Sequence, residues 1–220
     1  MKNYDSENLI ILDHLNFDYL STLKSEDDFV YLVKKKEQLE DKFIVKMAIN
    51  DGSEISTLSI KDIYNENEML PEISLVPGVV KLDDFFGDYH LPTSNLHRSI
   101  LVKSFGEGVV YQDDDIELKS SQMENLFDTI EKIHLNGIAD LDIKPRNVAL
   151  PKTGRPILFD FGTAQKLNSK NRTFFDYLMW KDILDLRSYF GELPFSISRD
   201  ILDFKSSYFR NYAERIIGKL

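Results

Sequence analysis

The chain has 220 residues, of which 42% are hydrophobic and 12% aromatic, so it can bury a substantial core as one domain or as two small lobes. It contains no cysteine, which excludes disulfides, thiolate metal sites and thiol nucleophiles. The formal net charge of −10 disfavours nucleic-acid binding and makes a basic protein partner easier to accommodate. No apolar run approaches the ~20 residues of a membrane span, so we expect an intracellular protein, in the cytoplasm or nucleus, with no membrane partner.

Strands dominate the elements predicted for the first hundred residues. Residues 29–33 and 43–48 are rich in β-branched and aromatic side chains and predict the two strands of a hairpin. Residues 59–70 carry a stripe at helical spacing and predict a helix. Residues 99–102 predict another buried strand, and the glycines within 106–108 predict a bend after it.

Helices dominate the prediction for the second half. The residues at 121–124 form the pattern of a capping box that starts a helix, and Gly137 supplies its stop. Residues 147–159 predict a hairpin. Two or three helices are expected to follow, from about residue 174 and from about residue 198.

The polar residues between positions 142 and 160 suit phosphoryl transfer, which needs positioning, a metal ion and charge neutralisation more than covalent chemistry. Asp142 can orient a hydroxyl and accept its proton. Lys144 can offset the charge of a transferred phosphoryl group. Asn147 and Asp160 offer oxygen ligands of the kind that a hard cation such as Mg²⁺ prefers. Asp142 and Lys144 are therefore the candidate catalytic residues, and Asn147 and Asp160 the candidate metal ligands.

Two motifs in this segment resemble those of the protein kinase superfamily. Residues 142–147, with the sequence D-I-K-P-R-N, look like its catalytic loop, D-x-K-P-x-N. Residues 160–162 look like its D-F-G motif. The motifs occur in the family's order, and the thirteen positions from Asn147 to Asp160 match its usual hairpin length.

The resemblance spans roughly residues 29–186 and implies an architecture for the whole chain. We expect an α+β, bilobal protein-kinase-like fold, formed by a single protein-kinase-like domain over residues 1–220. Its N-lobe would be a small antiparallel β-sheet at about 1–103. Its C-lobe would be a reduced set of helices at about 104–220.

The resemblance also implies ATP and Mg²⁺ as cofactors. Lys46 would hold the α- and β-phosphates and Glu66 would orient that lysine, with Glu68 as a rival on the same predicted helix. Asp182 resembles the helix aspartate that braces the catalytic loop, and a plain helix-terminal acid is an equally good interpretation. The residues implied to contact the nucleotide or its metal are Val30, Lys46, Glu66, Leu101, Asn147, Ala149 and Asp160.

Several departures separate this chain from an ordinary protein kinase. The glycine-rich loop that would cradle phosphates is missing, and residues 26–28, near its expected position, are acidic. Asp140 and Leu141 replace a histidine and an arginine, so we expect no activation through loop phosphorylation. The segment from Asp160 to Asp182 is short and lacks an Ala-Pro-Glu motif, which removes the platform for an extended peptide.

The adenine pocket is expected to differ as well. Ile44 stands where the family has a small alanine above the adenine, and the residue expected beneath the base, Ala149, is small instead. Our hypothesis is that the bulk has changed sides and left a slot of similar height.

Three functions are compatible with these features. Retention of the motif residues favours an ATP-dependent phosphotransferase of serine/threonine protein-kinase type, which transfers the γ-phosphate of ATP to a hydroxyl. Lys144 favours this over a small-molecule kinase of the aminoglycoside or choline type. The missing glycine-rich loop and peptide platform favour a pseudokinase that acts as a binding or regulatory module. The protein substrate or partner stays unknown.

Overall fold

The computed structural model divides into two compact units. The first unit comprises residues 1–67 and 81–107, and the second comprises residues 68–80 and 108–220. The residues that the structure describes are 5–24, 29–37, 41–92, 94, 96–105, 109–110, 118–151, 154–168, 172–194 and 196–219.

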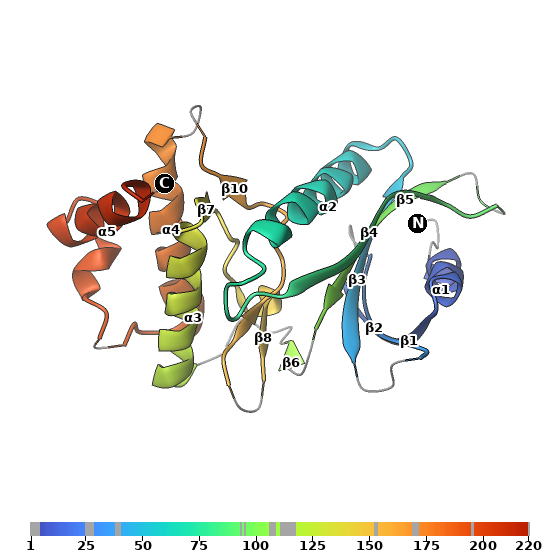
Figure 1. The fold of residues 1–220 in the computed structure, drawn as a ribbon, viewed down its shortest axis with the longest axis horizontal. Helices are drawn as coiled ribbons and strands as arrows, with labels where there is room; N and C mark the ends of the chain where they lie inside the picture. Colours follow the sequence, from blue (N-terminus) through green and yellow to red (C-terminus); the bar gives the residue numbers. More distant parts are fainter. Residues whose placement is uncertain are drawn as a thin grey trace. The chain divides into compact units, whose positions relative to one another are not determined.

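A five-stranded antiparallel sheet forms the centre of the first unit, with the strand order β1-β2-β3-β5-β4 (Figure 1). Its strands are β1 (Phe17–Lys24), β2 (Phe29–Lys35), β3 (Lys42–Asn50), β4 (Lys81–His90) and β5 (His97–Ser104). The three strands predicted from β-branched and aromatic runs are confirmed as β2, β3 and β5. The edge strands β1 and β4 were not predicted, because their side chains are mostly half-buried or exposed and give no clear apolar pattern.

Helix α1 (Asp5–His14) covers one face of this sheet and closes a hydrophobic core (Figure 1). The buried core residues are Ile11, Leu12, Phe17, Tyr31, Val33, Phe43, Val45, Met47, Leu91, Ile100 and Val102. The buried side chain of Arg98 also fixes the helix: it donates to the partly exposed Glu7 at 2.6 Å and to the buried Asn8 at 3.0 Å. Sequence analysis predicted no element here. The apolar run at 9–12 is short, and the structure buries only its second half.

Helix α2 (Glu54–Glu72) presents a buried stripe at helical spacing, and its first fourteen residues belong to the first unit. The stripe consists of Ser56, Ser59, Ile63, Glu66, Met69 and Leu70. The helix predicted at 59–70 is confirmed, and it starts earlier because Ser53 caps it. The Ser53 hydroxyl accepts the backbone N–H of Ser56 at 3.1 Å.

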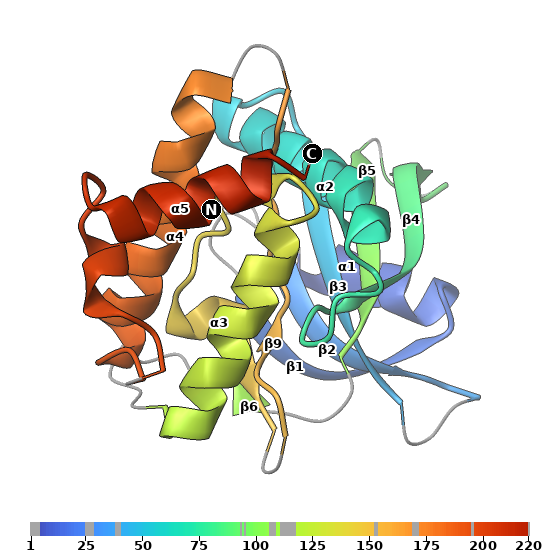
Figure 2. The ribbon, with the colours of Figure 1, turned by 60° about the vertical axis from the view of Figure 1, so that its left-hand side comes forward.

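Three helices and two small sheets make up most of the second unit. Helices α3 (Ser120–His134) and α5 (Ser207–Ile217) both pack against α4 (Arg172–Phe190) (Figure 2). One sheet contains β6 (Val109–Val110), β8 (Val148–Leu150) and β9 (Ile157–Leu158), and the other pairs β7 (Ile138–Ala139) with β10 (Gln165–Lys166). The described residues of this unit also include two 3-10 turns, η1 (Pro145–Asn147) and η2 (Arg199–Leu202), and the end of α2.

The predicted capping box at 121–124 is wrong. Helix α3 has Lys119 as its N-cap residue, and the Gln122 side chain accepts the backbone N–H of Lys119 at 3.1 Å. The predicted stop at Gly137 is confirmed, since the helix ends at His134 and Gly137 has a φ of 72°, which favours glycine.

The helix predicted from about residue 198 is also wrong in its extent. The chain forms the 3-10 turn η2 there and starts α5 only at Ser207, because the Ser206 side chain caps a new helix. Its hydroxyl accepts the backbone N–H of Phe209 at 3.0 Å.

In the part of the chain that the structure describes, no helix is long and apolar enough to cross a membrane.

Candidate active site

A loop between β7 and η1 carries both candidate catalytic residues. Its backbone adopts left-handed conformations at Asp140, with a φ of 65°, and at Asp142, with a φ of 49°. Such conformations cost non-glycine residues on the order of 1–3 kcal/mol each and persist only when neighbouring groups hold them. Asp182 in α4 supplies that hold, because its carboxylate accepts the backbone N–H groups of Asp140 at 2.9 Å and of Leu141 at 2.7 Å.

Asp182 is itself part of a buried hydrogen-bond chain. The Nε2 atom of His134 lies 2.9 Å from the Asp182 carboxylate, and the Nδ1 atom of the same ring lies 2.7 Å from the Tyr212 hydroxyl. Burial raises the pKa of Asp182, and its contacts with His134 and with the Leu141 N–H offset part of that rise. These contacts fit the interpretation of Asp182 as a brace for the loop. The hydrogen-bond chain links the loop to Asp182 in α4, then to His134 in α3 and to Tyr212 in α5.

The loop brings three of the predicted site residues into direct contact. The Asp142 carboxylate accepts hydrogen bonds from Lys144 Nζ and, at 3.1 Å, from Asn147 Nδ2. The same Asn147 nitrogen donates to the backbone carbonyl of Asp142 at 2.9 Å. Asn147 is buried in η1, whereas Asp142 is half-buried. The side chain of Asn147 thus fixes the orientation of Asp142.

The β8–β9 hairpin places Asp160 at the same end as Asn147. Val148 pairs with Leu158, and the backbone N–H of Phe159 donates to the carbonyl of Asn147 at 3.2 Å. The Asp160 carboxylate accepts the backbone N–H of Gly162 at 3.2 Å. An amide oxygen and a carboxylate at one end of a hairpin fit Mg²⁺, which commonly takes one or two protein ligands and completes its shell with phosphate and water oxygens.

Asp140, for which the sequence resemblance implies a histidine in the family, links the loop to the segment that follows residues 160–162. Its carboxylate accepts a hydrogen bond from Gln165 at 3.0 Å and lies 3.2 Å from Lys181 Nζ. Its backbone carbonyl accepts the Thr163 hydroxyl at 3.1 Å. Desolvation lowers the pKa of Lys181, but the carboxylates of Asp185 and Asp140 outweigh it and hold the pKa above its usual value.

In the first unit, Lys46 and Glu66 are both buried and form an ion pair. Lys46 Nζ in β3 lies 3.8 Å from Glu66 Oε2 in α2, and the two residues are 3% and 0% exposed. Val30 in β2 and Leu101 in β5 are the strand partners of Lys46, so the three residues form one row across the sheet. The rival Glu68 is exposed.

Lys103 is a functional candidate that sequence analysis missed. It lies in β5, is 1% exposed, and its Nζ atom donates to Glu66 Oε1 at 2.7 Å. The two-residue period of a strand places Lys103 on the same face as Leu101, but that signal alone is weak. A lysine at the end of a buried strand is more often solvated, and only the contact with Glu66 distinguishes this one.

The nucleotide contacts expected from the sequence all remain predictions, including those of Lys46 and Glu66. Ile44 is buried in β3 opposite Lys103, and Ala149 is buried in β8 opposite Ile157. These two positions belong to different units, so the change in bulk across the adenine is untested. The expected position of the glycine-rich loop, at residues 25–28, lies outside the described residues.

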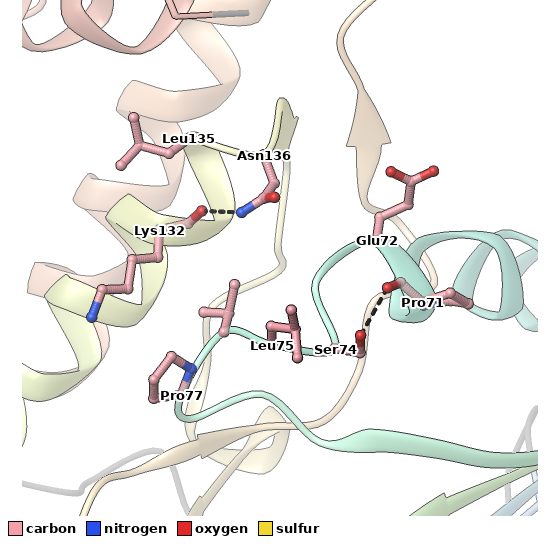
Figure 3. Close-up of a pocket in the computed structure, with 9 residues that line it drawn as sticks. Pro71, Glu72, Ser74, Leu75, Pro77, Lys132, Leu135 and Asn136 are labelled. Atoms are coloured by element: carbon pink, nitrogen blue, oxygen red, sulfur yellow. Dashed lines mark hydrogen bonds between the residues drawn. The ribbon is translucent and has the colours of Figure 1, made fainter.

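A surface pocket of about 400 Å³ lies elsewhere in the second unit, between the end of α2 with the segment that follows it and the C-terminal end of α3 (Figure 3). It is lined by Pro71, Glu72, Ser74, Leu75, Val76, Pro77, Lys132, Leu135 and Asn136. Leu75 is 96% exposed, and Asn136 donates to the carbonyl of Lys132 at 2.8 Å. The pocket contains none of the predicted site residues.

Comparison with known proteins identifies the family. The sequence model of the protein kinase domain matches residues 29–184, which is well over half of the chain. The chain therefore belongs to the protein kinase domain family, and its five-stranded antiparallel sheet and helices agree with the predicted α+β bilobal kinase fold.

The chain is also similar to the serine/threonine-protein kinase PDK1 of Cryptococcus neoformans. The two sequences are 30% identical over 130 residues, which are 57% of this chain and 10% of that protein. The chain thus spans about a tenth of the length of this curated relative.

Proposed function

We propose that the chain is an ATP- and Mg²⁺-dependent phosphotransferase of serine/threonine protein-kinase type, which transfers the γ-phosphate of ATP to a hydroxyl. The observation that carries the proposal is the contact of Asp142 with Lys144 and Asn147 on a loop in left-handed conformations. Backbone strain of this kind gathers at functional sites, where it sets the geometry of a reactive group before the ligand arrives. The buried carboxylate of Asp182 maintains that geometry.

Each polar residue of the loop has a role in the proposal. Asp142 would orient the acceptor hydroxyl and take its proton. Lys144 would neutralise charge on the phosphoryl group as it moves. The Asn147 amide nitrogen is bonded to Asp142, so its amide oxygen is the atom that would meet a cation together with the Asp160 carboxylate. A bound magnesium ion would supply neutralisation of the phosphate charge.

The first unit would supply the remaining nucleotide contacts. Lys46 would bind the α- and β-phosphates, and Glu66, at 3.8 Å, would orient it. Val30 and Leu101 lie in the strand row of Lys46 and would contact the base, with Ala149 of the second unit as a further contact.

The acceptor is proposed to be a serine or threonine of a basic protein, rather than nucleic acid or a lipid surface. The net charge of −10 favours a positively charged partner. The name of the fungal relative, a serine/threonine-protein kinase, also supports a protein acceptor. The short segment after Asp160 favours a folded substrate over an extended peptide.

The test is phosphate transfer from radiolabelled ATP to a set of lysine- and arginine-rich proteins that contain serine and threonine. We expect transfer by the wild type and a loss of about 10²–10⁴-fold in Asp142→Asn, which keeps the shape of the side chain but cannot accept the proton. Asp185→Asn, on α4, is the matched control and should retain transfer, because Asp185 pairs with Lys181 and lies outside the proposed machinery.

Two results would contradict the proposal. Equal transfer by Asp142→Asn and the wild type would show that the loop is not the reactive site. ATP binding with no transfer to any acceptor, and full biological function of Asp142→Asn, would instead identify a pseudokinase that acts as a binding module.

A further inference from the structure

One buried carboxylate in the first unit is shared by two lysines. Glu66 accepts a hydrogen bond from Lys103 through Oε1 at 2.7 Å, and Lys46 lies 3.8 Å from Oε2. The side chains of Lys46, Glu66 and Lys103 are 4%, 0% and 2% exposed. Solvent therefore screens these charges little, and their mutual distances decide how strongly they interact.

The two lysines hold the carboxylate unequally. A separation of 2.7 Å is that of a charge-assisted hydrogen bond, which is about twice as strong as a neutral one. A separation of 3.8 Å is that of an ion pair without a short hydrogen bond. Lys103 is therefore the stronger partner of Glu66.

The location of Lys103 makes this bond a link between two elements. Its strand partners are the apolar residues Ile44 in β3 and Leu82 in β4. Its ammonium group bonds instead to Glu66 in α2. Removing one member of a buried, hydrogen-bonded charge pair is costly. The pair thus ties α2 to the centre of the sheet.

We propose that Lys103 is a positioning residue that holds Glu66, and with it α2, against β5 before any nucleotide binds. This inference rests on the proposed function, in which Lys46 meets the phosphates. Because Lys103 continues to neutralise Glu66, Lys46 can turn part of its interaction toward a phosphate without leaving the buried carboxylate uncompensated. The α2 helix then needs neither nucleotide nor a phosphorylated loop to reach its working position, which agrees with Leu141 at the family's arginine position.

The first test needs no nucleotide. Hydrogen–deuterium exchange of the full chain is measured over residues 54–67 for wild type, Lys103→Met, Lys103→Arg and Lys46→Met. We expect Lys103→Met to raise amide exchange in this part of α2 by roughly tenfold or more, since it removes a charged hydrogen bond. Lys46→Met should raise it much less, and Lys103→Arg should stay near the wild type. Lys35→Met, which removes the half-exposed ion pair of Lys35 with Asp83, is the control and should leave α2 unchanged.

The second test asks whether the bond between Lys103 and Glu66 also supports nucleotide binding. We expect Lys103→Met to weaken MgATP binding by roughly tenfold, with binding restored in Lys103→Arg. Exchange in α2 that rises as much in Lys46→Met as in Lys103→Met would overturn the inference. MgATP binding by the wild type with unchanged α2 exchange in Lys103→Met would also overturn it while leaving the proposed function intact. If Lys103→Met raises α2 exchange but the wild type binds no MgATP, the role of Lys103 in holding α2 is supported and the proposed function is contradicted.

Discussion

Among the residues that the structure describes, each unit of the chain holds one fully buried carboxylate with several partners, and the partners differ in kind. Glu66 in the first unit contacts the ammonium groups of Lys46 and Lys103. Asp182 in the second unit contacts two backbone N–H groups and the ring of His134. A carboxylate bound to the backbone fixes the course of the chain, whereas one bound to lysine side chains can share them with an incoming anion. We therefore expect Asp182 to matter most for stability and Glu66 most for ligand binding.

The largest expected effect on stability belongs to Asp182. Asp182→Ala leaves the N–H groups of Asp140 and Leu141 and the ring of His134 without their buried acceptor, so the free energy of unfolding should fall by about 3–5 kcal/mol. Urea denaturation measures this change. The control Asp185→Ala breaks a partly exposed pair with Lys181 on the same helix and should cost about 1 kcal/mol or less. Equal losses in the two variants would remove the distinction between the carboxylates.

A smaller change in stability, with a different response to ligand, is expected at Glu66. Glu66→Gln keeps the shape of the side chain but removes the charge that Lys46 and Lys103 share, and it should lower the free energy of unfolding by about 1–3 kcal/mol. Because the variant should bind MgATP less tightly, its deficit should grow by about 1.4 kcal/mol at saturating ligand for each tenfold loss of affinity. Denaturation with and without MgATP measures both quantities, and a deficit that ligand leaves unchanged would contradict the proposed role.

The smallest effect is expected at a third carboxylate, Asp176, which lies on the same helix as Asp182. Its Oδ1 atom is buried and has no hydrogen-bond partner among the described residues. Burial and the charge of Glu214 raise the pKa of Asp176 above its ordinary value of 3.8. The folded state therefore binds this proton more readily than the unfolded state does, and the contribution of Asp176 to stability falls as the pH rises from 3.8 through the raised pKa.

Asp176→Asn tests that sign. The variant should be more stable than the wild type at pH 7, by less than about 1 kcal/mol, because it removes a poorly solvated charge. The advantage should shrink as the pH falls toward 4, where the wild-type carboxyl takes up its proton. Melting temperatures between pH 4 and pH 7 measure the trend, and an advantage that is constant over this range would contradict it.

The parts of the fold that the sequence predicted are those with strong local patterns. Strands β2, β3 and β5 are rich in β-branched and aromatic side chains, and β3 is buried on both faces, so its apolar run is nearly continuous. Helix α1 could not be predicted, because only Asn8, Ile11 and Leu12 of its ten residues are buried, and Arg98 reaches it from ninety positions away in the sequence. Such contacts exist only in the folded chain.

The candidate site shows the same division. Asp142, Lys144, Asn147 and Asp160 could be selected because they fall within short motifs whose spacing is fixed by one loop and one hairpin. Lys103 could not, because its significance depends on Glu66, which is thirty-seven positions away. The contact of Asp142 with Lys144 and Asn147 depends on the left-handed backbone conformation of Asp142. The motif gives the residue types but does not predict that conformation.

The most direct test of the account is the thermal stability of the wild type and of Asp160→Asn in millimolar ATP, each with and without Mg²⁺. Asp185→Asn serves as the control carboxylate variant. We predict that ATP raises the melting temperature of the wild type and of the control only when Mg²⁺ is present, and that Asp160→Asn loses this rise. The absence of any rise in the wild type, or an equal rise in Asp160→Asn, would contradict a nucleotide site built on these residues.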